Sequence, residues 1–463
     1  MKIYLETMGC QMNKLDSELV LGRLRAAGHE IVDAAATADA VLYNTCSVRR
    51  HAEEKVFSRL GEQCKRKRRG GGRPIVGVLG CMAQRLAGEL AQKFPGVDII
   101  CGPSEIDRLG ELLEGALAEQ RQLAIAPPRP QRPRELDDQA RRRLEAFDIS
   151  RPVASAGGAQ AFVRAQRGCD NFCTYCVVPY VRGSEQSRDP AAVCQEVRRL
   201  VDGGVKEITL LGQAVNQYAW RDGGRQVGLA DLLAMLDPIA GIERIRFVTN
   251  YPGHFDRAIL QVWAALPKVC EYLHVPAQSG SDRVLRAMNR RYTIAEYLDL
   301  LAAARQMVPN LSIAGDFIVG FPGETEEDFQ ASCDLVRRAG YKNSFIFRYS
   351  PREGTVAART LADDVPAAEK ARRNAELLAV QNEVSRVHHQ RLVGSVQQVL
   401  VEGPSVRAHK QPRSAPPGTV QLTGRTRGDH IVAFDGAPSL AGQFVNVRVT
   451  GATALALTGE ASV

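Results

Sequence analysis

No stretch of this 463-residue sequence is apolar for long enough to cross a lipid bilayer, and its first residues contain no apolar export signal. These absences predict a soluble, cytoplasmic protein without a membrane partner. Strong charge of one sign is also missing, because the formal net charge is only +8. Such a charge permits a polyanionic partner such as RNA but does not require one.

Cysteine is the informative residue that is present. The chain has 11 cysteines, an odd number that excludes complete pairing. Disulfides are disfavoured in the cytoplasm, so clustered cysteines there indicate metal or redox chemistry. The chain is also too long for one ordinary domain, and its hydrophobic content of 44% is enough to form two to four cores.

The first domain, expected over residues 1–118, alternates strand-like and helical patterns. Short apolar strands are predicted at 3–7, 40–44 and 75–79, with a helix at 17–27 after a turn at Asn13 and Asp16. This alternation predicts a doubly wound parallel sheet. Cys10, Cys46 and Cys81 each follow a predicted strand end. Because ligands gather at the carboxyl ends of parallel strands, the three thiols could converge on one metal centre.

Residues 119–158 interrupt this alternation. Prolines between positions 127 and 133 and the glycine pair at 157–158 enclose a polar stretch, which predicts a linker. Three arginines at 141–143 are interpreted either as a solvated helix face or as an RNA contact.

A second α/β domain is expected over residues 159–390. Six strand-like segments, at 161–166, 207–211, 244–249, 271–275, 312–319 and 344–349, are separated by helical patterns. A helix at 191–201 is one of these, because Asp189 and Pro190 form a cap and a first-turn proline. Six such units predict an incomplete βα barrel. A further helix at 366–391 would place Leu377, Val380, Val384 and Val387 on one face.

Residues 391–463 change to an all-β pattern. Strand-like segments at 395–402, 420–423, 430–434 and 444–449 are divided by Gly and Pro turns, which predicts a small β-barrel. Basic residues outnumber acidic ones in this segment, as suits a domain that binds oligonucleotides.

The clearest chemical signal is Cys169, Cys173 and Cys176, on the loop after the first predicted barrel strand. Three thiolates at this spacing can hold three irons of a cubane cluster and leave the fourth iron open to a ligand. A zinc site is the alternative, but it would need a fourth Cys or His, and none follows closely.

This spacing, with Tyr175 before the last cysteine, resembles the radical S-adenosylmethionine superfamily. Within it, Gly-Cys-Gln-Met-Asn at 9–13, Asn-Thr-Cys-Ser-Val-Arg at 44–49 and Gly-Cys-Met-Ala-Gln-Arg at 80–85 resemble the methylthiotransferase family. Residues 177–183, 211–213, 276–281, 316–325 and 349–352 also match that family, and the terminal barrel is similar to a TRAM RNA-binding domain. Ala214 and the Asn250-Tyr251 pair depart from the usual family pattern.

The resemblance implies a tRNA-modifying enzyme with S-adenosylmethionine and two 4Fe–4S clusters as cofactors. Cys169, Cys173 and Cys176 would hold the radical-generating cluster, and Cys10, Cys46 and Cys81 the cluster that delivers sulfur. It further implies an electron donor such as flavodoxin or ferredoxin, and we expect a monomer. Five residues that follow predicted strand ends are expected to contact the cofactor, with structural roles as the alternative: Gly212, Gln213, Gln278, Ser279 and Gly320.

The branch with Cys-Gln-Met-Asn and Thr-Cys-Ser-Val-Arg methylthiolates carbon 2 of N6-(dimethylallyl)adenosine at tRNA position 37, next to the anticodon. Alternative targets within the family are threonylcarbamoyladenosine in tRNA and a ribosomal-protein aspartate. A non-catalytic, metal-containing RNA-binding protein is the alternative from another class.

Two further groups of residues carry weaker predictions. Cys64, Cys101, Cys194, Cys270 and Cys333 lack metal-ligand spacing and are expected to be structural. The basic run at 65–69 with the glycines at 70–72 predicts an exposed loop, which either grips phosphates or is simply solvated.

Overall fold

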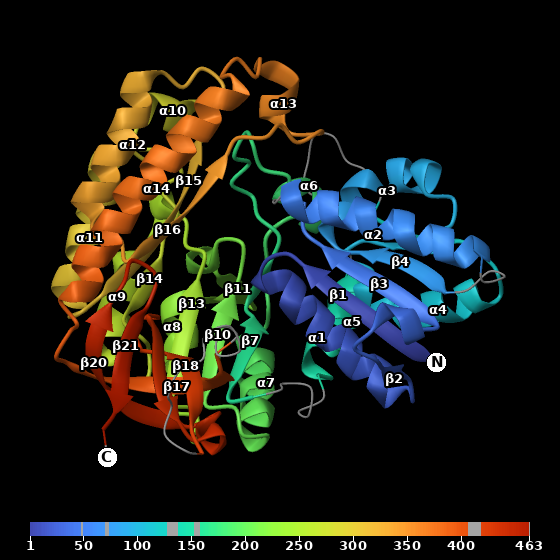
Figure 1. Ribbon diagram of the computed structural model, residues 1–463, viewed down its shortest axis with the longest axis horizontal. Coiled ribbons are helices and arrows are strands. Elements are labelled where there is room, and N and C mark those ends of the chain that lie inside the picture. The colour runs from blue at the N-terminus through green and yellow to red at the C-terminus, as the bar shows by residue number, and fades with distance from the viewer. Residues whose placement is uncertain (48–49, 70–73, 127–137, 152–157, 406–417, 463) are drawn as a thin grey trace.

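The computed structural model describes residues 1–47, 50–69, 74–126, 138–151, 158–405 and 418–462. An α/β domain comes first, then a half-barrel, then a small β-barrel (Figure 1). The predicted fold class is therefore confirmed. Among the described residues, no helix combines the length and the apolar character needed to span a bilayer.

The N-terminal sheet is parallel, with strand order β2-β1-β3-β4-β5-β6. Its strands are β1 (Lys2–Met8), β2 (Glu30–Ile31), β3 (Ala40–Thr45), β4 (Ile75–Leu79), β5 (Ile99–Cys101) and β6 (Gln122–Ala124). Helices α1 (Gln11–Ala26) and α4 (Leu109–Leu117) cover one face, and α2 (Arg50–Arg69) and α3 (Cys81–Lys93) cover the other. The strand order reverses direction between β1 and β3, the position where ligands bind in such sheets.

Two local predictions in this domain are wrong. Helix α1 begins at Gln11, so Asn13 and Asp16 lie in its first turns instead of forming a turn before it. Both polar side chains are buried because each has a partner, Asn44 for Asn13 and arginines for Asp16. The basic run at 65–69 is the last turn of α2 and not a loop, and residues 70–72 lie outside the described ones.

The segment predicted as a linker contains regular structure. Strand β6 extends the N-terminal sheet, and helix α5 (Asp138–Ile149) packs against the half-barrel helix α7 (Pro190–Asp202). Arg143 on α5 forms an ion pair with Glu105, so it is not simply solvated. The proline-rich stretch at 127–133 and Gly157 lie outside the described residues.

The half-barrel consists of two parallel three-stranded sheets. Strands β7 (Gln160–Arg164), β10 (Glu207–Leu211) and β13 (Arg244–Val248) form one, and β14 (Tyr272–His274), β15 (Ser312–Val319) and β16 (Asn343–Arg348) form the other. The two sheets meet between β13 and β14, where the Asn250 amide donates to the His274 carbonyl at 3.0 Å. All six strands match the predicted segments to within two residues.

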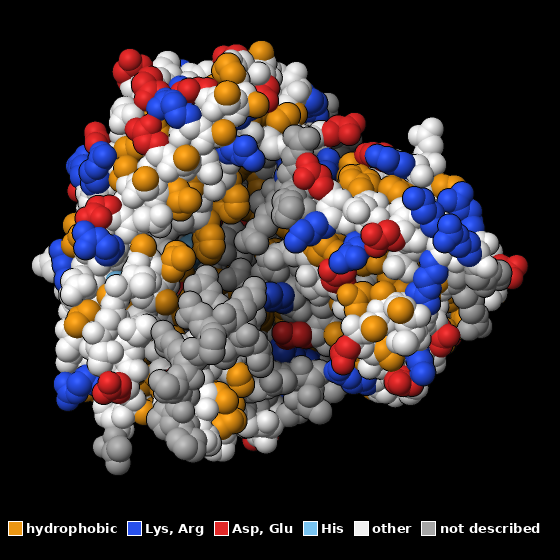
Figure 2. All heavy atoms as spheres, in the orientation of Figure 1, with side chains coloured by type: hydrophobic (Ala, Val, Ile, Leu, Met, Phe, Trp, Pro, Cys, Tyr) orange, Lys and Arg blue, Asp and Glu red, His pale blue; other side chains and the backbone are white. Residues whose placement is uncertain are grey.

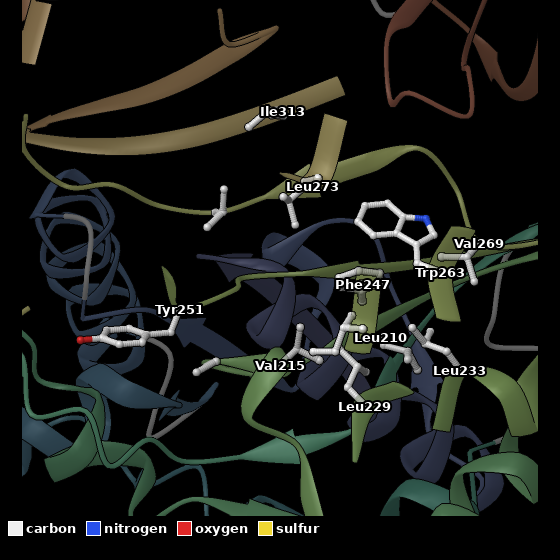
Figure 3. Packing of buried hydrophobic residues seen from close by; sticks show 14 of the residues in the cluster. Leu210, Val215, Leu229, Leu233, Phe247, Tyr251, Trp263, Val269, Leu273 and Ile313 are labelled. Carbon is white, nitrogen blue, oxygen red and sulfur yellow. The ribbon is translucent and has the colours of Figure 1, made fainter. Parts of the chain in front are cut away.

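Helices cover the convex side of the half-barrel: α7, α8 (Leu229–Leu236), α9 (Arg257–Ala265), α11 (Ile294–Met307), α12 (Glu326–Ala339) and α14 (Ala367–Gln390). Figure 3 shows part of the core beneath α8 and α9, where the Trp263 ring stands edge-on to Phe247; the ring centroids are 5.0 Å apart. The predicted face of α14 is only partly correct, because Val387 is 42% exposed. Near that end the helix instead buries Ser385 and His389, the latter bonded to the terminal barrel through Thr453.

The terminal barrel is closed, with order β17-β18-β19-β21-β20. Strands β17 (Val396–Pro404), β18 (Val420–Arg425), β19 (Ile431–Gly436) and β20 (Phe444–Ala452) match the prediction, and β21 (Leu457–Ala461) was not foreseen. The barrel docks on the amino ends of the half-barrel strands: Arg246 donates to the carbonyls of Thr426 and Arg427, and Lys342 pairs with Asp429 at 2.8 Å. The carboxyl ends, where a site is expected, lie at the opposite end.

Candidate functional site

Cys10, Cys46 and Cys81 come together at the carboxyl edge of the N-terminal sheet. Each follows a strand: β1, β3 and β4, respectively. The hydrogen bond with Cys46 lowers the pKa of Cys10 to about 6, although burial opposes this shift. Burial raises the pKa of Cys81, against the charge of Arg182. The prediction that three distant cysteines share this edge is confirmed.

An asparagine pair fixes this edge. The Asn13 side chain donates to Asn44 Oδ1 at 2.9 Å, and the Asn44 amide returns a bond to the Asn13 carbonyl at 2.9 Å. The Cys10 thiol donates to Asn13 Oδ1 at 3.2 Å, so the same pair orients a candidate ligand. The first turn of α1 is therefore tied to the end of β3.

Two glycines allow the strand ends to approach so closely. A Cβ atom at Gly9 would lie 2.9 Å from the Cβ of Cys46. A Cβ atom at Gly80, whose φ is +89°, would lie 2.4 Å from Asn44 Oδ1. A larger residue would have to displace Cys46 at the first position and Asn44 at the second, which explains why glycine precedes both Cys10 and Cys81.

Cys169, Cys173 and Cys176 lie on the loop between β8 (Gln166–Arg167) and α6 (Val178–Arg182). Each sulfur accepts a hydrogen bond: Cys169 from the Asn171 amide at 3.3 Å, Cys173 from Arg290 at 3.6 Å and Cys176 from the Val178 backbone at 3.5 Å. Burial raises the pKa of Cys169 to about 11 and also raises that of Cys176. A metal that bound this trio would have to displace protons.

The two trios are neighbours in the fold. Cys81 packs against Val177 and Val181, and Val177 directly follows Cys176. Arg182, at the end of α6, donates from Nε to the Cys81 sulfur at 3.2 Å and from Nη2 to Asp16 at 2.9 Å. Helix α6 therefore joins the trio of Cys169, Cys173 and Cys176 to the trio of Cys10, Cys46 and Cys81.

Both trios consist of sulfur donors alone. No three of the described His, Cys, Asp and Glu side chains are grouped so that they could hold one metal ion. The thiolates of a cubane cluster need not all contact one ion, because each binds a different iron at a separate corner. Hydrogen bonds from Arg182 and Arg290 to sulfur are of the kind that tunes such clusters. Each trio thus offers three sulfur donors of the kind that an iron–sulfur cluster takes, and cluster binding stays a prediction for both trios.

The five predicted cofactor contacts differ in their surroundings. Gln213 carries a buried Oε1 that has no hydrogen-bond partner among the described residues, so it is available to a ligand. Gln278 has φ +74°, a strained conformation for a residue other than glycine. By contrast, Ser279 is fully buried and bonds the Ser281 backbone, and a Cβ at Gly320 would meet Lys370 at 2.3 Å. A Cβ at Gly212 would lie 3.0 Å from Gln166. Contact with a cofactor stays a prediction for all five.

Sequence reasoning missed Thr249, His274 and Arg290. Thr249 has φ +68°, a rare strain for a β-branched residue, and its backbone N–H donates to His274 Nδ1 at 3.2 Å. His274 Nε2 lies 3.3 Å from Asp316 on the neighbouring strand. No metal-ligand or catalytic spacing marks any of the three. For Thr249 and His274, the only available signal was a position at or near the end of a predicted strand.

The departures from the family pattern have local roles. Asn250 and Tyr251 are buried, and the Tyr251 ring lies beneath the Arg290 guanidinium at 4.5 Å. The Tyr251 hydroxyl accepts from the Arg291 backbone at 2.9 Å. Ala214 is buried in the half-barrel core. The predicted structural cysteines Cys101, Cys194, Cys270 and Cys333 are likewise buried, and Cys64 is partly buried.

Comparisons with known proteins agree with these three parts of the fold. Residues 2–102 match the family described as Uncharacterized protein family UPF0004, residues 163–336 match the Radical SAM superfamily, and residues 390–461 match the TRAM domain.

Curated relatives match over almost the entire chain. Proteins named tRNA-2-methylthio-N(6)-dimethylallyladenosine synthase are 46% identical in Rhodopirellula baltica (99% of this chain, 95% of the relative) and 41% identical in Geobacter metallireducens (100% and 98%). Among solved structures, the radical S-adenosylmethionine methyltransferase TsrM from Kitasatospora setae has 16% identity and a TM-score of 0.54, covering 77% of this chain and 74% of that one. That likeness concerns the fold alone.

Proposed function

This chain belongs to the tRNA-2-methylthio-N6-dimethylallyladenosine synthase family of radical S-adenosylmethionine enzymes, and on that premise we propose how its residues divide the reaction. The reaction is methylthiolation of carbon 2 of N6-(dimethylallyl)adenosine at position 37 of tRNA. Cys169, Cys173 and Cys176 would hold the radical-generating cluster, and Cys10, Cys46 and Cys81 a second one. The observation that supports two neighbouring clusters is the contact of Cys81 with Arg182 and with Val177, which directly follows Cys176.

The reaction needs cofactor chemistry because the carbon 2 hydrogen of adenine is not acidic enough for a side-chain base. S-adenosylmethionine and two 4Fe–4S clusters, when bound, would supply the radical that removes this hydrogen and the methylated sulfur that replaces it. The protein contributes ligands, orientation and exclusion of water. Gln213, with its unpartnered buried oxygen, is the best-supported cofactor contact of the five predicted.

The substrate assignment can be tested directly. The purified, anaerobically reconstituted enzyme should convert N6-(dimethylallyl)adenosine in tRNA to its 2-methylthio derivative, as measured by mass spectrometry of digested nucleosides. Threonylcarbamoylated tRNA and the ribosomal-protein target should remain unmodified in the same assay. Modification of either one instead would overturn the substrate assignment, and absence of 5′-deoxyadenosine would favour a non-catalytic RNA-binding protein.

For the tRNA we propose phosphate contacts at the end of α2. Lys and Arg side chains gather there in the space-filling view (Figure 2). Arg66 donates to the Ala36 carbonyl at 2.7 Å and Lys67 pairs with Asp98, so these two serve the fold. Lys65, Arg68 and Arg69 are the remaining cations of this turn and would face phosphates.

Reversing these three charges, as Lys65→Glu, Arg68→Glu and Arg69→Glu, should weaken tRNA binding for every tRNA sequence. The slope of log affinity against log salt should fall by about 1 for each phosphate that the protein no longer neutralises. Filter binding at several salt concentrations measures both effects. Arg221→Glu, on the exposed hairpin of β11 (Ala219–Asp222) and β12 (Arg225–Gly228), is a matched control. An unchanged slope in the triple variant would leave the end of α2 as a solvated helix terminus.

We propose further that an electron donor such as flavodoxin or ferredoxin reduces the radical-generating cluster. The enzyme is proposed to be a cytoplasmic monomer with domains at 1–118, 159–390 and 391–463.

The small terminal barrel lies at the end of the half-barrel opposite the site. This position supports a role in which the barrel binds the tRNA at a distance from the site.

A further inference from the structure

Arg290 lies in the segment between α10 (Asp282–Ala287) and α11, and its side chain is buried. Its guanidinium makes three hydrogen bonds in different directions. Nη1 donates to the Cys173 sulfur at 3.6 Å, Nη2 to the Pro276 carbonyl at 2.7 Å and Nε to the Tyr292 hydroxyl at 3.0 Å. The group is therefore held in one orientation with one edge directed at a candidate cluster ligand.

Two aromatic rings enclose the guanidinium. Its central carbon lies 4.5 Å from the centre of the Tyr251 ring and 5.1 Å from that of Tyr292. No Asp or Glu among the described residues forms an ion pair with Arg290. By contrast, the buried Arg164 and Arg182 both pair with Asp16, and the buried Arg188 pairs with Glu196.

A buried cation without a carboxylate needs another source of negative charge. Aromatic faces attract a cation weakly compared with the cost of removing it from water. The sulfur of Cys173 is the remaining partner, and it becomes anionic when it binds iron. The positive charge of Arg290 is thus balanced only when Cys169, Cys173 and Cys176 bind their cluster as thiolates.

We propose that Arg290 is the counter-ion of this cluster and raises its reduction potential. Three thiolates on an oxidised 4Fe–4S core give one net negative charge, and uptake of one electron from an external reductant makes it two, with no bond formed or broken. A fixed positive charge against Cys173 stabilises the reduced form more than the oxidised form. Arg290 therefore acts through the ligand as a tuning residue; it is not a catalytic residue.

Arg182 provides the matched comparison. Arg182 donates to Cys81, so its charge acts on the cluster proposed for Cys10, Cys46 and Cys81. The charge of Arg182 is balanced by Asp16. Tyr292→Phe provides a second control, because it removes the oxygen that accepts from Arg290 Nε but leaves the charge in place. The inference rests on the proposed assignment of the cluster ligands.

The test is a redox titration of the full-length chain in which Cys10, Cys46 and Cys81 are replaced by alanine. Only Cys169, Cys173 and Cys176 can then hold iron. With dithionite as reductant and electron paramagnetic resonance as readout, Arg290→Gln should lower the potential by about 60 mV or more, a tenfold change in the one-electron equilibrium. Arg290→Lys should recover part of the shift. Arg182→Gln and Tyr292→Phe should leave this potential unchanged.

An unchanged potential in Arg290→Gln with full iron and sulfide content would overturn the inference. If Arg290→Gln does not assemble a cluster, Arg290→Lys decides the question. Iron content restored by lysine supports the role of the charge, whereas loss of iron in both variants, with thermal unfolding like that of the parent, assigns Arg290 to packing and overturns it. Absence of iron in the parent itself would refute the ligand assignment, which is a separate result.

Discussion

Cys173→Ala should abolish the reductive cleavage of S-adenosylmethionine, whereas Cys46→Ala should leave cleavage intact and stop only the insertion of sulfur. Cys173 lies on the loop of the half-barrel, and Cys46 lies at the carboxyl edge of the N-terminal sheet. Loss of one thiolate removes one protein ligand from one proposed cluster and leaves the other trio complete. The measurements are 5′-deoxyadenosine by chromatography and methylthiolated nucleoside by mass spectrometry, with iron content determined for each variant.

Cys64→Ala is the control for this pair. Its residue is partly buried, belongs to neither trio and lies on α2 against Gly96. Both products should form at the rate of the parent. Equal residual methylthiolation in Cys173→Ala and Cys46→Ala would refute the division of labour between the trios.

Among the substitutions proposed here, Asp16→Ala should lower the free energy of unfolding the most. Asp16 is 1% exposed and accepts from both Arg164 of β7 and Arg182 of α6, so it joins the N-terminal domain to the half-barrel. Removing one partner from a buried ion pair costs about 3–5 kcal/mol because the remaining charges stay buried. The melting temperature should fall by about 5 °C or more in calorimetry.

Glu383→Ala is the matched control, since its ion pair with Arg386 is exposed at the surface of α14 and should not affect the melting temperature. Asp16→Asn tests the mechanism, because an amide keeps the shape and loses the charge. If both Asp16 variants melt at the temperature of the parent, the buried ion pairs do not hold the two domains together.

The same network predicts acid sensitivity. Burial pushes the pKa of Asp148 upward, but Arg164, Arg167 and Arg188 together hold that pKa below the ordinary value of an aspartate. A carboxyl with a depressed pKa stabilises the fold above its unfolded-state pKa, and that contribution is lost as the pH falls through the folded-state value. The contribution of Asp148 should thus be complete at neutral pH and disappear only below about pH 4, as thermal unfolding at a series of pH values would measure.

The sequence alone determined the three-part architecture and the reaction class, and it led to the proposal of six thiols as cluster ligands. Strand periodicity located all six half-barrel strands, because buried parallel strands are short apolar runs that local pattern identifies. The cysteine spacing from 169 to 176 is local in the chain and therefore visible in it. The true start of α1 was missed because the burial of Asn13 and Asp16 depends on partners distant in sequence, and the short β21 was missed as well.

Only the tertiary structure decided which charges meet. Arg182 on Cys81, Arg290 on Tyr251 and Cys173, and Asp16 between two arginines all join residues far apart in the sequence, and no spacing rule predicts such pairs. The sequence could name the proposed sulfur ligands because their chemistry is carried by residue type. The cations that set their electrostatic environment are common surface residues until the fold buries them, and that burial gives them their effect.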